Sequence, residues 1–154
     1  MEQHPSNFRI DLSPPQNGWI AIEVQAGEQH FSESVSYTPN DFIAELVTAL
    51  CLLSKGSPEA AALAFSEPTT YHFRFWRQAN ANLVQFEIQD AKTPAKPLLT
   101  MCMSAEELCK SFWRAFRRLA SVTTPDQYQT AMRRPFPSSG VETLGILSRR
   151  LART

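Results

Sequence analysis

Four residues in the middle of the chain could carry acid and base chemistry. Glu67 lies beside Pro68, and His72, Glu87 and Asp90 follow within a short stretch. Carboxylates and an imidazole can transfer protons if they converge on a substrate. However, polar residues of these types are common at strand ends and turns, and no motif fixes their mutual geometry. We therefore predict a protein that is not an enzyme, and we keep an enzyme of unfamiliar type as an alternative.

Metal binding and nucleophilic catalysis have little support in the sequence. A metal site would need clustered ligands at fixed spacing, but the three histidines are scattered and no two cysteines lie three residues apart. The chain has no G-x-S-x-G turn, and its five glycines form no P-loop or dinucleotide fingerprint. We expect no catalytic residue, no metal and no cofactor. The three cysteines, which lie in apolar stretches, are expected to be buried free thiols: Cys51, Cys102 and Cys109.

Charge is distributed very unevenly along the chain, although its formal net charge is zero. Residues 1–67 contain nine Asp or Glu and two Lys or Arg, whereas residues 68–154 contain six and thirteen. Such segregation creates local potentials that govern which macromolecules approach a surface. We therefore predict a protein partner. The candidate partner-binding residues are Glu23, Glu28, Glu33, Asp41, Glu45 and Glu67 on the acidic side, and Arg114, Arg117 and Arg118 on the basic side.

Nucleic-acid binding remains an alternative to a protein partner. Arginines in the C-terminal region could contact phosphates. The aromatic residues next to Arg74 and Arg77 could stack on unpaired bases: Tyr71, Phe73, Phe75 and Trp76. An alternating aromatic strand is, however, more typical of the inside of a sheet. The arginines could equally form a solvated face or pair with the acidic front half of the same chain.

Period-two alternation predicts most of the strands. The expected strands are residues 8–12, 19–25, 31–37, 70–77, 83–88 and 98–103. Residues 19–25 and 31–37 should form one hairpin, and residues 70–77 and 83–88 a second. Residues 58–65 are ambiguous because their alanines favour a helix, whereas the short length and the following Pro68 favour a strand. We favour a strand there.

Helical spacing of apolar residues, together with capping signals, predicts the helices. Residues 42–53 follow a start signal in which a hydroxyl caps, Pro39 occupies the first helical position and Asp41 lies in the first turn. Residues 106–119 follow a capping box of Ser104 and Glu107. A short helix should begin at Pro125 after Thr124, and a last helix should be capped by Ser139 and Glu142.

The expected organisation is a flexible N-terminal arm, residues 1–17, followed by a single α+β domain, residues 18–154. We predict one antiparallel sheet of about five or six strands, two main helices packed on one face and a helical C-terminal tail. The longest apolar run, residues 42–53, falls short of the roughly 20 residues that a membrane span needs. Because the polar N-terminus lacks the basic flank and apolar core of a secretory signal, we expect a cytoplasmic protein with no membrane association.

A family resemblance adds to this reading. The string Ser36-Tyr37-Thr38-Pro39-Asn40-Asp41-Phe42, a leucine-rich helix, and Glu67-Pro68 before an aromatic strand resemble a loosely defined group of small bacterial proteins. Some members of that group look like immunity proteins of toxin loci. The resemblance covers about residues 18–120 and implies an α+β fold and a protein that binds and neutralises a toxin domain. It identifies no catalytic residue.

Overall fold

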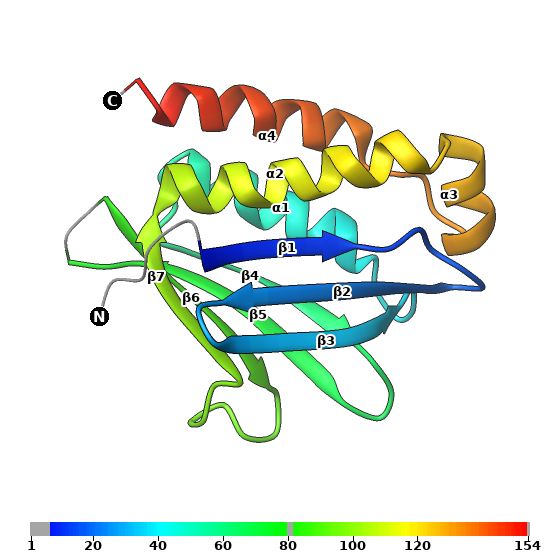
Figure 1. Cartoon of the computed structure of the whole chain (residues 1–154), viewed down its shortest axis with the longest axis horizontal. Coiled ribbons are helices and arrows are strands. Elements are labelled where there is room, and N and C mark those ends of the chain that lie inside the picture. The colour runs from blue at the N-terminus through cyan, green and yellow to red at the C-terminus, as the bar shows by residue number, and fades with distance from the viewer. Residues whose placement is uncertain (1–6, 80–81, 154) are drawn as a thin grey trace.

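The computed structural model describes residues 7–79 and 82–153, and within these ranges the chain forms seven strands and four helices. Figure 1 shows their arrangement. The strands are β1 (Phe8–Leu12), β2 (Trp19–Ala26), β3 (Gln29–Ser36), β4 (Glu59–Phe65), β5 (Thr70–Arg77), β6 (Leu83–Asp90) and β7 (Leu99–Ser104). The helices are α1 (Phe42–Ser54), α2 (Ala105–Val122), α3 (Pro125–Met132) and α4 (Ser138–Leu151). The class is α+β, as predicted. Residues 1–6 of the expected arm lie outside the described residues.

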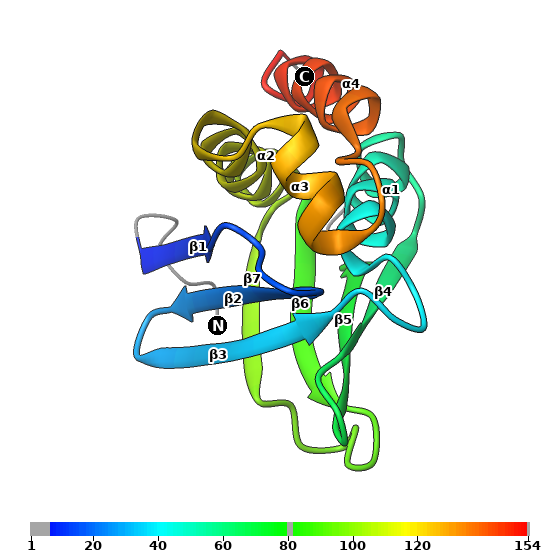
Figure 2. The ribbon, with the colours of Figure 1, turned by 90° about the vertical axis from the view of Figure 1, so that its right-hand side faces the viewer.

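The strands form two antiparallel sheets, so the prediction of a single sheet was wrong. The first sheet has the order β1-β2-β3 and the second the order β4-β5-β6-β7. Figure 2 shows the strands of the first sheet running across those of the second. Alternation identifies which residues form strands but not which strands pair, because pairing depends on contacts between distant segments. Here α1 lies between β3 and β4 in the chain, and in the part of the chain that the structure describes no strand of the first sheet pairs with a strand of the second.

The helices form a layer on one side of the sheets (Figures 1 and 2). Helices α1 and α2 lie there as expected, but α4 packs on both of them and buries Val141 and Leu144. The expected C-terminal tail is therefore part of the folded body. Helix α3 closes one end of the molecule, where the amide of Gly18 donates to the carbonyl of Ala131 at 2.7 Å. Within the described residues, no helix combines the length and the apolar character needed to cross a membrane.

One apolar core joins both sheets and the helical layer. Strand β2 contributes Ile20, Ile22 and Val24 from one face, as the alternation predicts. Aromatic rings fill the centre: the rings of Phe75 and Phe86 stack at 4.9 Å, and Phe112 of α2 meets both edge-on. The predicted strand at residues 8–12 also belongs to this core, because β1 pairs with β2 along its length and buries Phe8 and Ile10.

Residues 58–65 contain a strand, as favoured above, because β4 pairs with β5 from Glu59 to Phe65. Two of the predicted caps are confirmed: the hydroxyl groups of Ser104 and Thr124 cap α2 and α3. Two are wrong.

Helix α1 starts at Phe42, so Pro39 is not its first residue. Its cap is the Asp41 carboxylate, which accepts a hydrogen bond from the Ala44 amide at 3.2 Å, and not a hydroxyl group. Helix α4 begins directly after Pro137 without a side-chain cap, and Ser139 already lies inside its first turn.

Side chains close the free edges of three strands. The Gln29 amide forms two hydrogen bonds with the backbone of Thr100 in β7, and both are 2.8 Å long. At β1 the Arg118 guanidinium donates to the Ile10 carbonyl at 2.6 Å, and at β3 the Ser66 hydroxyl donates to the Ser34 carbonyl at 2.7 Å. Edge strands otherwise present unpaired backbone groups to other chains, so these contacts keep the edges from pairing further.

Replacing Gln29 by alanine should destabilise the protein, because Thr100 would lose both hydrogen bonds to that side chain. We expect the free energy of unfolding to fall by about 1–3 kcal/mol. Gln25→Ala is the matched control, since Gln25 is an exposed glutamine on β2, and it should change stability by no more than about 0.5 kcal/mol. Urea-induced unfolding of both variants measures the difference, and equal losses would contradict the edge-closing role.

Candidate protein-interaction surfaces

The second sheet brings together only part of the set considered for acid and base chemistry. The register pairs His72 with Gln89 and Arg74 with Glu87, so His72 and Glu87 are diagonal neighbours on adjacent strands. His72 of β5 and Glu87 of β6 both project from its outer face, the face away from the core, whereas exposed Glu67 lies in the turn between β4 and β5. Asp90 ends β6 and accepts a hydrogen bond from the Lys92 amide at 2.9 Å. These side chains line none of the grooves described below.

The Glu87 carboxylate belongs to a polar network across the outer face. It accepts hydrogen bonds from the Gln89 amide at 2.9 Å and the Thr100 hydroxyl at 3.2 Å. Arg74 lies opposite Glu87 in the register of β5 and β6, and its guanidinium stacks 5.2 Å from the Trp76 ring. The other aromatic residues of β5, Tyr71, Phe73 and Phe75, are buried in the core and present no rings for stacking on bases.

The three cysteines are free thiols. Cys109 is buried as expected, and burial raises its pKa to about 11. Cys51 and Cys102 are half-buried, and burial also raises the pKa of Cys51. Because the thiolate is the reactive form, burial suppresses the reactivity of Cys109 and Cys51. In residues 7–79 and 82–153, no three His, Cys, Asp or Glu side chains group closely enough to hold a metal ion.

Glu33, one of the predicted partner-binding residues, contacts the second sheet of its own chain. It projects from the inner face of β3 opposite Ile22, and its carboxylate accepts hydrogen bonds from the Tyr71 hydroxyl at 3.0 Å and the Ser66 hydroxyl at 3.4 Å. Burial and then the Glu33 carboxylate raise the pKa of Tyr71. The sequence did contain a signal that Glu33 faces inward, since it alternates in phase with the apolar residues Phe31 and Val35.

Asp41 and Glu45 lie together at the start of α1, beside β4. Asp41 caps the helix, and the Glu45 carboxylate accepts from the Asn40 side-chain amide and from the Leu63 backbone amide, the latter at 3.4 Å. Asn40 also donates to the Leu63 carbonyl at 2.9 Å. These contacts attach the start of α1 to the free edge of β4.

The remaining acidic candidates are exposed to solvent. Glu23 lies on the outer face of β2, Glu28 in the turn after it and Glu67 in the turn after β4. Glu23 stands directly opposite Asp11 of β1, an unfavourable pairing of like charges. Arg9 offsets it by contacting Asp11 at 2.9 Å. Glu23, Asp11 and Arg9 line a groove of about 280 Å³ on the first sheet, together with Gln25 and His30.

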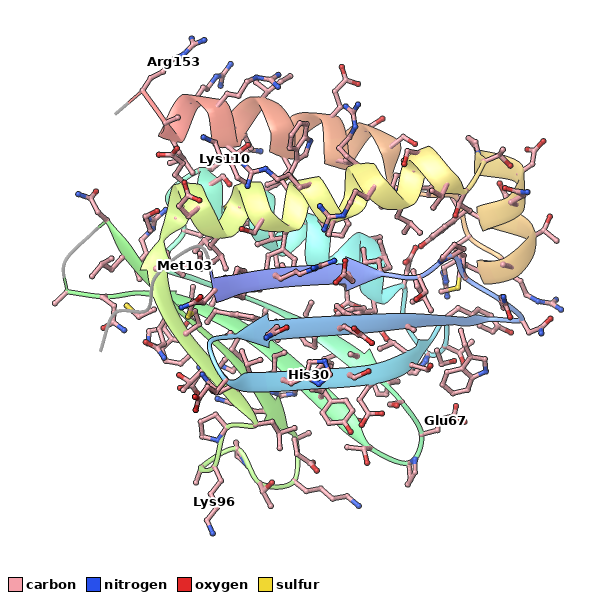
Figure 3. All side chains as sticks on the ribbon, viewed as in Figure 1. His30, Glu67, Lys96, Met103, Lys110 and Arg153 are labelled. Carbon is pink, nitrogen blue, oxygen red and sulfur yellow. The ribbon has the colours of Figure 1, made fainter. Side chains whose placement is uncertain are left out.

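The basic candidates lie on α2 in the helical layer. Figure 3 shows the charged side chains of this layer, with Lys110 and Arg153 labelled. Arg114 is exposed. Arg118 donates to the Ile10 carbonyl and lies 3.9 Å from the Asp11 carboxylate. This arginine therefore pairs with the acidic front half of the chain, which was one of the predicted alternatives. Arg117 stacks 5.4 Å from the Trp113 ring.

A groove of about 370 Å³ runs between α2 and α4 on this basic side of the molecule. Its lining includes Trp113, Arg117 and Arg149 together with Glu142. The lining therefore combines two guanidinium groups, one indole and one carboxylate. Such a surface can contact anionic or planar groups of a partner.

A groove of about 690 Å³ lies where α3 meets the β1–β2 connection and Tyr37. It is lined mostly by neutral polar side chains, together with Asp126 and Arg133.

A groove of about 440 Å³ between α1 and β4 was not expected from the sequence. It is lined by Asp41, Ala44, Glu45, Thr48, Ala49 and Leu52 of the α1 segment and by Ala60 and Ala61 of β4. The alanine-rich composition of residues 59–64 indicated low bulk, but only the tertiary structure places α1 beside this edge. Of the six predicted acidic residues, two therefore share one groove.

Comparison of the chain with models of protein families, with curated proteins and with solved structures finds no match. The resemblance to immunity proteins therefore stays a prediction.

Glu33→Ala should destabilise the fold, because the Tyr71 hydroxyl would lose a charged acceptor between the sheets. We expect a loss of about 1–3 kcal/mol in the free energy of unfolding. Glu23→Ala, which removes an exposed carboxylate from the same sheet, should change it by about 0.5 kcal/mol or less. If chemical denaturation showed the same small change for both variants, Glu33 would not be a structural residue.

Proposed function

We propose that this chain is a non-enzymatic protein-binding module that acts as an immunity protein, binding a bacterial toxin and neutralising it. The distribution of charge in space carries the proposal. Helices α2 and α4 bring Arg114, Arg117 and Arg149 to the helical side, while exposed Glu23 and Glu28 lie on the first sheet. An inhibitor needs a complementary charged surface rather than reacting groups, and such a surface accelerates encounter with its target.

The acidic side of the molecule is the better candidate for the partner. Arg118 is already bound by the chain's own backbone and Asp11, and Arg117 stacks on Trp113. Three acidic candidates, Glu23, Glu28 and Glu67, are by contrast exposed to solvent. A toxin domain that acts on nucleic acid has a basic cleft, and an acidic protein surface can occupy such a cleft.

Capture from the native cell tests this proposal. The tagged full-length chain should recover a protein partner, and expression of that partner alone should arrest growth that this chain restores. Recovery of no protein, or of a partner that is harmless when expressed alone, would contradict the immunity role.

Charge reversal tests which side binds. Glu23→Lys with Glu28→Lys should slow association with the captured partner about tenfold at low salt, because attraction to a basic surface is lost. The matched control, Arg114→Glu with Arg117→Glu, should not slow it. Association rates measured at low and high sodium chloride should converge as salt screens the charges. A slower rate only for the arginine variant would assign binding to the basic side.

Nucleic-acid binding is a second candidate, favoured by the stacked Arg117 and Trp113 pair in the groove between α2 and α4. A labelled single-stranded oligonucleotide should then bind with an affinity that falls steeply as salt rises. Arg117→Ala with Arg149→Ala should weaken that binding, whereas Arg74→Ala on β5 of the second sheet should not. Fluorescence anisotropy measures both effects, and absence of binding at low salt would dismiss this candidate.

A further inference from the structure

Strand β4 ends the second sheet with an edge that is closed over only part of its length. The side-chain contacts that reach this edge from described residues converge on Leu63, whose amide donates to Glu45 and whose carbonyl accepts from Asn40. The free edges of β1, β3 and β7 are each contacted from another element, as described above. Glu59 and Ala61, nearer the start of β4, are exposed.

The backbone of these two residues points away from the sheet. In an antiparallel pair, successive residues direct their N–H and C=O groups alternately toward and away from the partner strand. Leu63 directs both groups toward Asn40 and Glu45, so residues two and four positions earlier, Ala61 and Glu59, direct theirs to the same side. Consistent with this, Pro58 and Ser66, which have the opposite parity, hydrogen-bond to the β5 side.

The groove between α1 and β4 runs beside this open edge. Small side chains line it on both elements, with Ala44, Thr48 and Ala49 on α1 and Ala60 and Ala61 on β4. Leu52 also lines the groove and is 46% exposed, which leaves an apolar contact available next to unpaired backbone groups. A sheet edge flanked by a helix is the arrangement in which an extended peptide can add as a further strand.

The titratable residues that line this groove are Asp41 and Glu45, and exposed Glu59 follows at the edge itself. A strand entering here would bring its side chains close to these three carboxylates. Arg74 of β5 stands opposite Ala61, but its guanidinium stacks on Trp76 and the carboxylates outnumber it three to one. Lysine or arginine on that strand would be favoured and acidic residues disfavoured.

We infer that the edge of β4 at Glu59 and Ala61, with the groove beside α1, is a docking site for a short, extended, basic segment of a partner protein. The segment adds as a strand, exchanging backbone hydrogen bonds with Glu59 and Ala61 while an apolar side chain contacts Leu52. This inference rests on the proposed protein-binding function and specifies which surface performs it. A second copy of the chain is a poorer occupant, because pairing two β4 edges would bring the same carboxylates together.

A minimal peptide provides the first test. The probe is a six-residue peptide of alternating lysine and valine with blocked ends, added to the uniformly nitrogen-15-labelled full-length chain. We expect chemical-shift changes centred on residues 59–61 and 44–52 and slower hydrogen exchange at the amides of Glu59 and Ala61. A peptide of alternating glutamate and valine should bind at least about tenfold more weakly. Shift changes confined to other surfaces, or equal binding of both peptides, would overturn the inference.

Variants then separate the backbone of the edge from its side chains. Ala61→Pro removes the outward N–H, and proline is tolerated on an edge strand where that group faces outward. It should weaken peptide binding about tenfold. Ser32→Pro is the matched control, because it removes an outward N–H from the free edge of β3, two positions before Ser34, at an exposed residue outside this groove. It should bind like the unmodified chain. Should Ala61→Pro fail to fold, Thr48→Trp fills the groove from exposed Thr48 without changing the backbone of β4 and should also abolish binding.

The partner captured from cells distinguishes this inference from the proposed function. If the unmodified chain captures a toxin but Ala61→Pro and Thr48→Trp capture it equally well, the docking site is wrong and the immunity function stands. If no protein is captured while the basic peptide still docks at residues 59–61, the immunity function fails and the edge site stands. A dimer of the unmodified chain that Ala61→Pro dissociates, seen by sedimentation, would assign the edge to a second copy.

Discussion

The hydrogen-bonding demand of backbone groups at sheet edges is the constraint on which much of this structure depends. Seven strands divided between two sheets leave four edge strands, because neither sheet closes on itself. Each edge presents N–H and C=O groups that require a partner or water. Side chains from other elements supply many of these partners, so the contacts that close the edges are also the contacts that connect the two sheets and the helices.

Several charged residues consequently serve the fold rather than a partner. Arg118 joins α2 to β1, Glu33 joins β3 to β5, and Glu45 joins α1 to β4. Glu33 and Glu45 are half-buried, and burial makes such groups costly to leave unpaired. The charges that project into solvent are a smaller set than the sequence suggests: exposed arginines lie on α2 and α4, and exposed Glu23 and Glu28 lie on the first sheet and its turn. The groove beside β4 is the place where acidic groups and unpaired backbone meet.

That coincidence gives the proposed binding function a specific form. Electrostatic attraction accelerates encounter but confers little orientation, whereas added strand hydrogen bonds fix a register. A surface that combines both could select a basic extended segment over other charged molecules. The alanines of β4 contribute by leaving room beside α1, so residues with no chemistry of their own determine whether a partner backbone can approach.

The sequence alone determined the α+β class and the kind and approximate bounds of the elements, because alternation and helical spacing are local properties of the chain. It also indicated that Ile20, Ile22 and Val24 face inward. Only the tertiary structure decided that the strands form two sheets, that α4 packs on α1 and α2, and that Glu33 and Arg118 bind within the molecule. Pairing, edge closure and the groove at Ala61 arise from segments far apart in sequence, and no local pattern of residues encodes which of them meet.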